Sequence, residues 1–146
     1  MEIHQSAVIL LLVFCVSFST LHAQPAYILP RYQKFLNQHL GPHMSGQKCT
    51  SEIRERNITG TDNLCKPVNT FIQANENDLK AVCARTNQMN RNLFKSGQQY
   101  PVVTCRLQSG EKHPDCKYST GKLSTRYIVL GCTGGWPVHY ESVQVY

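Results

Sequence analysis

Three residues of this chain are best suited to acid–base chemistry: the histidines His39 and His139, and Lys66. Imidazoles have an ordinary pKa near ~6.5, so one ring can be neutral while another is protonated at neutral pH. Such a pair can remove a proton from one group and deliver a proton to a second group. A lysine that is charged at the same pH can stabilise negative charge that develops in the transition state. The three side chains together predict a base, an acid and a cation acting on one anionic centre.

Lys66 lies in a constrained stretch of sequence, Cys65-Lys66-Pro67-Val68-Asn69-Thr70-Phe71. Pro67 fixes its own backbone and favours an extended conformation at Lys66, so the lysine side chain is aimed in one direction. The residues that follow, from Val68 to Ile72, are β-branched or aromatic at most positions. This composition predicts a short strand directly after the lysine.

His39 falls on the apolar face of a predicted helix. Pro30 is typical of a helix start, and Gly41-Pro42 is typical of a helix stop. Between them, one face repeats at helical spacing through Tyr32, Phe35, Leu36, His39 and Leu40. A histidine on such a face is usually a satisfied core residue, so this position alone does not predict catalysis.

His139 lies in a predicted final strand, from Val138 to the end of the chain. Because side chains alternate between the two faces of a strand, His139 and Glu141 share one face with Val143 and Val145. The Glu141 carboxylate can therefore reach the imidazole and select its tautomer. The alternative is an ordinary solvated pair between a histidine and a glutamate.

Three motifs in this chain resemble those of the pancreatic-type ribonuclease family, which includes the angiogenins. Lys34 to His39 matches the family pattern KFxxQH, and Cys65 to Phe71 matches CKxxNTF. Pro137 to Glu141 is PVHYE, where the family has PVHFD. The motifs occur in the family's order, and the similarity covers nearly all of residues 32–146.

The resemblance implies that the chain cleaves RNA with an internal nucleophile. His39 would be the base that accepts the ribose 2′-hydroxyl proton, and His139 would be the acid that protonates the leaving 5′-oxygen. Lys66 would stabilise the charge on the non-bridging phosphate oxygens. The expected product is a 2′,3′-cyclic phosphate, and the reaction needs no metal ion or other cofactor.

The resemblance also implies a set of substrate-binding residues. Gln38 would bind the phosphate, and the backbone N–H of Tyr140 would do the same, with tyrosine replacing the family's phenylalanine. Thr70 would bind the base 5′ to the cleaved bond; its hydroxyl donates and accepts, which suits cytosine and uracil. Asn69 would brace the site or the base pocket. Glu141 replaces an aspartate and adds one methylene beside the histidine.

The first residues predict a signal peptide. An apolar run from Ala7 to Phe18 is followed by small and polar residues that end at Ala23, although the leading region has no lysine or arginine. The run is shorter than a membrane-spanning helix and has the length of a signal-peptide core. We therefore expect a leader over residues 1–23 and one secreted, extracellular domain over residues 24–146.

The cysteines predict a disulfide framework. Cleavage of the leader would remove Cys15 and leave six cysteines, which allow 15 connectivities that spacing does not distinguish. The resemblance implies the pairs Cys49–Cys105, Cys65–Cys116 and Cys83–Cys132, and this six-cysteine pattern is similar to angiogenins and fish ribonucleases. Asn57-Ile58-Thr59 is in addition a sequon for N-glycosylation.

The order of predicted elements is typical of an α+β domain, with three short helices in the N-terminal half packed on a twisted, mostly antiparallel sheet. The second helix is expected over Cys49–Arg56, and the third follows Asn75 as N-cap with Asp78 three residues later. The polar segment Ala84–Gln99 is expected to be loop-like at first. Later strands are expected at Val102–Leu107 and Tyr127–Leu130, followed by a turn marked by Gly131, Gly134 and Gly135.

The chain is basic, with a formal net charge of +6 that becomes +7 when the leader removes Glu2. A positive excess attracts polyanions, so the expected partners are RNA, heparin-like glycans or anionic membranes. The resemblance to angiogenins adds a cell-surface receptor as an expected partner, and we expect the protein to be a monomer. The alternative function is angiogenin-like signalling, or host defence against bacteria, acting mainly by binding with weak catalysis. Arg54-Glu55-Arg56 occupies the region of the angiogenin nuclear-targeting run, and Glu55 weakens that signal.

Overall fold

The structure, a computed structural model, describes residues 25–142, so the predicted leader and Val143 and Val145 lie outside it. None of the helices within residues 25–142 is long and apolar enough to cross a membrane. The described elements are, in order, α2 (Leu29–His39), η1 (Gly46–Lys48), α3 (Cys49–Glu55), η2 (Thr61–Asn63), β1 (Val68–Ile72), α4 (Glu76–Val82), η3 (Arg85–Asn87), β2 (Leu93–Ser109), β3 (Lys117–Tyr118), β4 (Lys122–Thr133) and β5 (Trp136–Glu141).

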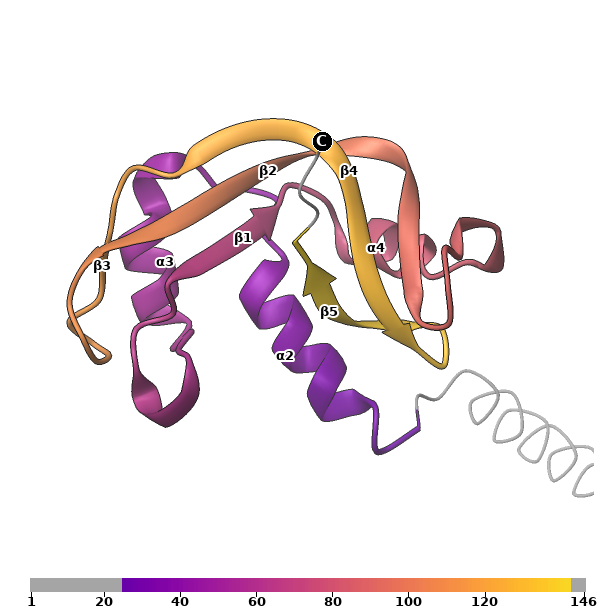
Figure 1. Cartoon of the computed structure of the whole chain (residues 1–146), viewed down its shortest axis with the longest axis horizontal. Helices are drawn as coiled ribbons and strands as arrows, with labels where there is room; N and C mark the ends of the chain where they lie inside the picture. Colours follow the sequence, from indigo (N-terminus) through magenta and orange to yellow (C-terminus); the bar gives the residue numbers. More distant parts are fainter. Residues whose placement is uncertain (1–24, 143–146) are drawn as a thin grey trace, which may run out of the picture.

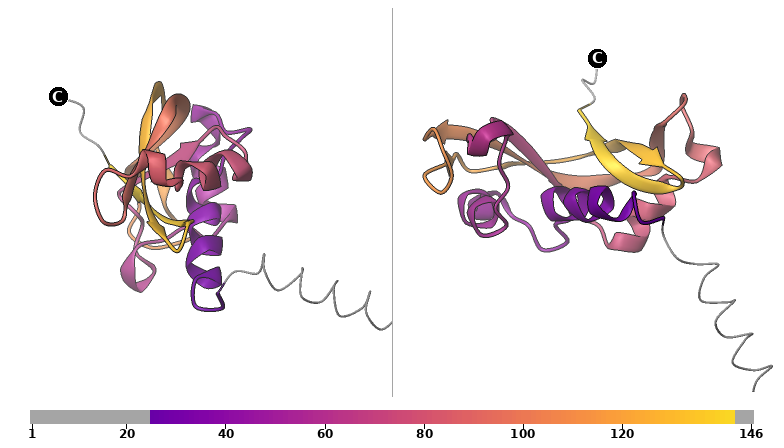
Figure 2. Two further views of the ribbon diagram at one scale, coloured as in Figure 1. Left: turned by 90° about the vertical axis from the view of Figure 1, so that its right-hand side faces the viewer. Right: turned by 90° about the horizontal axis from the view of Figure 1, so that it is seen from below.

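The strands form one antiparallel sheet in the order β1-β2-β4-β5, with β3 paired to β2 outside this path. Figure 1 shows β2 and β4 as two long curved strands, with α2 lying beneath their bend. The two views in Figure 2 place α2 against one side of the sheet, beside β5. The predicted α+β class, with three helices on a twisted antiparallel sheet, is confirmed.

The hydrophobic core consists of two clusters that share the central strands. Successive side chains of a strand point to opposite faces. Phe71 and Val103 therefore belong to the cluster under α3, while their neighbours Ile72 and Val102 belong to the cluster under α2 and α4. All four side chains are completely buried. Thus α2 packs on the sheet through one cluster, and α3 packs on it through the other.

Three disulfides connect the helices and loops to the sheet, in the same pairs that the family resemblance implies: Cys49–Cys105, Cys65–Cys116 and Cys83–Cys132. The paired cysteines are 56, 51 and 49 residues apart in sequence. In the chain-entropy model, closing a loop of this length destabilises the unfolded chain by about 4 kcal/mol per bond.

The early predicted elements are confirmed. α2 begins one residue before Pro30 and ends before Gly41, while α3 ends one residue before the predicted limit of Arg56. β1 spans the predicted residues Val68–Ile72. α4 begins after a capping box, in which the Asp78 N–H donates to Asn75 Oδ1 at 2.8 Å and the Asn75 N–H donates to Asp78 Oδ2 at 3.3 Å.

The polar segment Ala84–Gln99 becomes a strand earlier than the sequence indicated, because β2 begins at Leu93 and not at the expected Val102. Phe94 is buried and pairs with Leu130 of β4, more than thirty residues away. Ser96 is also buried, because its hydroxyl accepts a hydrogen bond from the Ile128 N–H and donates to the Gln98 carbonyl. Pairing with β4 thus provides hydrogen-bond partners for this polar segment. The local composition of the segment does not predict that pairing.

The predicted glycine turn was wrong for one residue. Gly134 and Gly135 form the turn between β4 and β5 with φ of 57° and 83°, but Gly131 lies inside β4. Gly131 pairs with His139, and a Cβ on Gly131 would lie 3.1 Å from the His139 Cβ. The glycine therefore lets the histidine side chain lie close over β4.

Candidate active site

His39 is held at the end of α2 by a single well-defined contact. Its Nδ1 lies 2.7 Å from the carbonyl oxygen of Thr70 in β1. A carbonyl only accepts hydrogen bonds, so Nδ1 carries the hydrogen and Nε2 is the unprotonated nitrogen of the neutral ring. The rings of Phe35 and Tyr140 both contact the imidazole, and the centroid of each lies 5.3 Å from that of His39. The imidazole is therefore fixed in one tautomer and one orientation.

Burial makes His39 neutral at physiological pH. The residue is only 7% exposed, and this desolvation is the main reason that its pKa is lowered to about 4. The hydrogen bond to Thr70 raises the pKa, while the positive charges of Lys66 and His139 lower it further. A neutral imidazole with an available Nε2 can accept a proton.

Lys66 is aimed by the amide of Asn69. Its Nζ donates to Asn69 Oδ1 at 2.8 Å and approaches Gln38 Oε1 at 3.4 Å. The Asn69 amide in turn donates to the Gln38 carbonyl at 2.8 Å, so Asn69 connects β1 to the last turn of α2. The pKa of Lys66 is lowered, first by burial and then by the nearby charge of Lys34. The pair of oxygens holds the ammonium group at the edge of the site.

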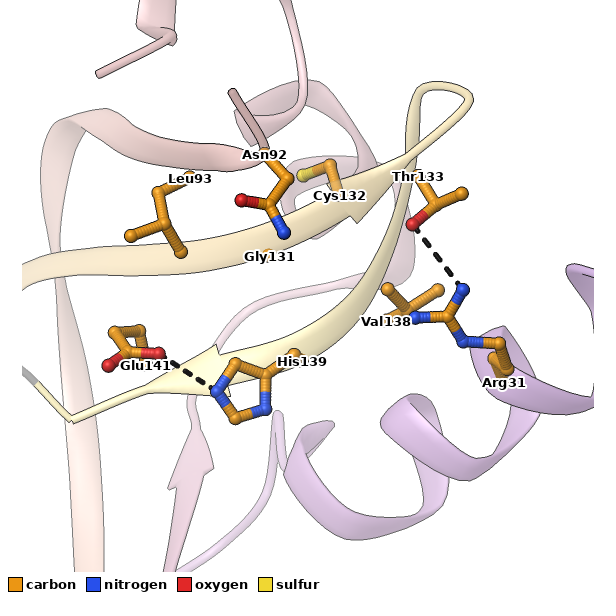
Figure 3. Close-up of a pocket in the computed structure, with 9 residues that line it drawn as sticks. All are labelled: Arg31, Asn92, Leu93, Gly131, Cys132, Thr133, Val138, His139 and Glu141. Atoms are coloured by element: carbon orange, nitrogen blue, oxygen red, sulfur yellow. Dashed lines mark hydrogen bonds and ion pairs between the residues drawn. The ribbon is translucent and has the colours of Figure 1, made fainter. Parts of the chain in front are cut away.

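His139 differs from His39 in its environment. It lies on β5, and 61% of its side-chain surface is exposed. Its Nε2 lies 2.9 Å from Glu141 Oε2, as the alternation of the strand predicts (Figure 3). The extra methylene of Glu141 therefore does not prevent the contact. The contact through Nε2 leaves Nδ1 as the ring nitrogen that is not bound to the carboxylate.

Three adjacent cavities form one groove across these residues. A cavity of about 260 Å³ is lined by both His39 and His139. It shares Arg31 and His139 with a cavity of about 510 Å³ that extends toward Asn92 and Glu141 (Figure 3). On its other side it shares Lys34 and Gln38 with a cavity of about 460 Å³ lined by Lys66 and Asn57. A groove lined by Arg31, Lys34 and Lys66 suits an extended polyanion.

The structure brings together all the residues that the sequence predicted for the site: His39, Lys66, His139, Gln38, Asn69, Thr70, Tyr140 and Glu141. Within residues 25–142, no group of three or more histidine, cysteine, aspartate or glutamate side chains is placed to hold a metal ion.

Two residues that line the groove were missed by the sequence analysis. Arg31 precedes Lys34 and Gln38 at i, i+3 and i+7 on α2, so helical spacing was a usable signal. Asn92 lies in the segment expected to be a loop, and its carbonyl accepts the Cys132 N–H at 2.8 Å. Only the pairing of β2 with β4 brings Asn92 near His139, so no local signal was available.

Comparisons with known proteins agree with this arrangement. Residues 30–141 match the family model described as pancreatic ribonuclease. The chain is 49% identical over 146 residues to Ribonuclease-like 3 of Danio rerio, covering 97% of each protein. It is 37% identical over 136 residues to Angiogenin-3 of Mus musculus, covering 90% of this chain and 91% of that protein.

A solved structure shows the same fold. The crystal structure of zebrafish RNase5 has 52% sequence identity and a TM-score of 0.77, and the match covers 83% of this chain and all of that one. The fold, the groove and the family match agree with one another. The chain belongs to the pancreatic ribonuclease family and is a ribonuclease.

Proposed function

We propose that the protein is a secreted endoribonuclease that cleaves RNA on the 3′ side of pyrimidines by transphosphorylation. The observation that carries the proposal is the contrast between two histidines that line one cavity. His39 is buried, neutral and pinned through Nδ1, whereas His139 is exposed and hydrogen-bonded to a carboxylate. The first environment suits a base and the second suits an acid.

The proposed reaction proceeds in one displacement. His39 Nε2 takes the proton of the ribose 2′-hydroxyl, and the 2′-oxygen forms a bond to phosphorus. The bond from phosphorus to the 5′-oxygen breaks, and His139 gives its proton to that oxygen. Lys66 stabilises the negative charge on the non-bridging oxygens. The products are a 2′,3′-cyclic phosphate and a free 5′-hydroxyl, and no step requires a metal ion.

The preference for pyrimidines is proposed for Thr70, whose side chain is nearly buried beside the ring of Tyr140. Gln38 is proposed to bind the phosphate, since its side chain lines the cavities on both sides of Lys34. The cavity that contains Asn92 is proposed to take the nucleotide downstream of the cleaved bond, because it begins at His139, the proposed acid. Asn69 is proposed to brace the site, since its side-chain oxygen accepts a hydrogen bond from Lys66.

The test compares refolded residues 24–146 with His139→Ala and with the control His43→Ala, whose histidine is exposed and outside the groove. Release of acid-soluble product is measured from transfer RNA and poly(C), with and without EDTA, and the four NpA dinucleotides are compared. We expect cleavage that EDTA does not abolish, that is lost in His139→Ala alone and that is faster at cytidine and uridine. Equal cleavage by His139→Ala would contradict the assignment of the acid, and equal rates at all four nucleotides would contradict the pyrimidine preference.

Secretion and glycosylation are part of the proposal. The leader over residues 1–23 is expected to be removed, so N-terminal sequencing of protein from culture medium should begin at Gln24. Asn57 is exposed, with φ of 53°, and lines the same cavity as Lys66. A glycan at Asn57 would be detected as added mass that Asn57→Gln removes. Masses that differ only by the extra methylene of glutamine would show that the sequon is unoccupied.

A second candidate function is signalling or host defence through binding. The similarity to an angiogenin and the positive charge favour it. Endothelial stimulation and bacterial killing should be measured for His39→Ala and for a charge reversal, Arg54→Glu with Arg85→Glu, at two exposed arginines. An effect that survives the first change and fails with the second would be caused by charge. An effect lost with His39→Ala would depend on catalysis.

A further inference from the structure

The C-terminal end of α2 carries the proposed base and is packed against the rest of the protein. The last carbonyl groups of a helix have no partner within the helix, and a packed end requires other donors. Asn69 supplies one donor, to the Gln38 carbonyl at 2.8 Å. Arg56 supplies two through Nη1, to the Asn37 carbonyl at 3.1 Å and to the Leu40 carbonyl at 2.7 Å.

Arg56 is itself held in place on every side. Its Nε donates to Glu52 Oε2 at 2.8 Å, which ties the guanidinium to α3. Its Cζ lies 5.1 Å from the ring centroid of Phe71, a fully buried residue of β1. The backbone carbonyl of Arg56 accepts a hydrogen bond from the Asn37 side chain at 2.9 Å. One side chain therefore joins α2, α3 and β1.

These contacts surround the two site residues on α2. Arg56 binds the carbonyls of Asn37 and Leu40, which are the residues just before and just after Gln38 and His39. β1 carries both Phe71, under the guanidinium, and Thr70, whose carbonyl accepts the His39 hydrogen bond. A shift of Arg56 would therefore move the helix end relative to the strand that orients the imidazole.

We propose that Arg56 is a positioning residue that holds the last turn of α2 so that His39 and Gln38 face the groove. Only arginine suits this task, because its planar guanidinium donates in several directions at once and also stacks on a ring. Its positive charge at a helix C-terminus is favourable as well. A lysine would keep the charge and lose the fork of donors.

The assignment changes the meaning of the basic run Arg54-Glu55-Arg56. Arg54 and Glu55 are exposed, whereas Arg56 is partly buried and hydrogen-bonded to α2 and α3. The run therefore presents one exposed arginine followed by an acid. A charge reversal at Arg56 would disturb α2. For this reason the charge test proposed above combines Arg54 with the exposed Arg85 and leaves Arg56 unchanged.

The experiment compares Arg56→Lys with the matched control Arg54→Lys, an exposed arginine in the last turn of α3, two residues before Arg56. Cleavage of cytidylyl-3′,5′-adenosine is measured well below the melting temperature of each variant, and rates are expressed per folded molecule. Misplacement of a catalytic group by a fraction of an ångström is expected to lower kcat about ten-fold in Arg56→Lys, with KM changed less. Arg54→Lys should match the unmodified protein.

A second measurement reports on His39 directly and does not require activity. The His39 Nδ1 proton, hydrogen-bonded to Thr70, should exchange with solvent faster in Arg56→Lys by NMR, and Arg54→Lys should not change it. Glu52→Ala, which removes only the Nε partner, should show a smaller effect in both measurements. It replaces Arg56→Lys in the test if the lysine variant does not fold.

Unchanged kcat and unchanged proton exchange in Arg56→Lys would overturn the proposal. If the lysine variant does not fold, the same result in Glu52→Ala would overturn it. So would a loss of activity that only follows the unfolded fraction, because that result describes a residue needed for stability alone. The kinetic consequence rests on the proposed function. If the unmodified protein does not cleave RNA, that function fails, and the proton exchange of His39 still decides whether Arg56 positions the ring.

Discussion

Buried His39 should make the protein lose stability as the pH falls, by an amount that the structure sets. The pKa of the ring is about 4 in the folded protein and ~6.5 in the unfolded chain. Between these values the unfolded chain binds a proton that the folded protein does not bind. The free energy of unfolding therefore rises with pH across this window and is independent of His39 above it.

The magnitude follows from the two pKa values. Relative to pH 7.5, the titration of His39 should lower the free energy of unfolding by about 1 kcal/mol at pH 6, about 2 kcal/mol at pH 5 and about 3 kcal/mol at pH 4. His39→Asn removes the titrating ring and keeps an amide that can donate to the Thr70 carbonyl. The variant should lack this part of the acid sensitivity.

Urea unfolding with intact disulfides, followed by circular dichroism from pH 4 to 7.5, measures the effect. Other groups titrate in the same range, so the relevant quantity is the difference between the unmodified protein and His39→Asn at each pH. That difference should fall by about 3 kcal/mol from pH 7.5 to pH 4. His43→Asn, at an exposed position, is measured in parallel as the control for replacing a histidine by asparagine.

A flat difference for His39→Asn would refute the reasoning, since it would mean that burial does not disfavour the charged ring. A direct check is the NMR titration of the His39 ring, whose midpoint should lie well below that of an ordinary imidazole. A midpoint near ~6.5 would contradict the environment described here.

Three further predictions concern other parts of the molecule. Tyr140→Phe should keep the stack on His39 and remove the phenol hydroxyl that interacts with the Thr70 side chain. The Thr70 hydroxyl is then free to bind the base, so kcat/KM for cytidine and uridine dinucleotides should rise a few-fold. An unchanged ratio of these values to those for the purine dinucleotides would contradict this. Replacing Cys83 and Cys132 together by alanine should lower the free energy of unfolding in urea by about 4 kcal/mol or less, and no loss would show that this bond does not constrain the unfolded chain. Asn75→Ala should remove the capping box of α4 and cost about 1 kcal/mol in the same assay, whereas an unchanged midpoint would show that the cap is dispensable.

The site was predictable where the determinants are local. Pro30, Gly41 and the apolar spacing between them define α2, and alternation along β5 places Glu141 beside His139. Both patterns act within a few residues, because a helix repeats every 3.6 residues and a strand every two. The motifs then assign chemistry to residues whose positions the local geometry already constrains.

The second half of the segment Ala84–Gln99 was not predictable in this way. Its side chains are mostly polar, and its strand exists because the backbone pairs with β4 far along the chain. Asn92 enters the groove for the same reason. Strand pairing between distant segments depends on the residues of the partner strand and on burial. The local sequence of one strand therefore does not predict it.

The sequence by itself determined the types of the reacting groups and the short elements that carry them: a histidine at a helix end, a lysine before a strand and a histidine beside a carboxylate. Only the tertiary structure decided the states of these groups. His39 becomes a neutral base because it is buried against Phe35 and Tyr140, and this burial outweighs the Thr70 carbonyl, which favours the protonated ring. These three residues come from three different elements. Burial and hydrogen-bond partners are properties of the packed chain, and they shift a proton equilibrium that the residue type alone leaves at its ordinary value.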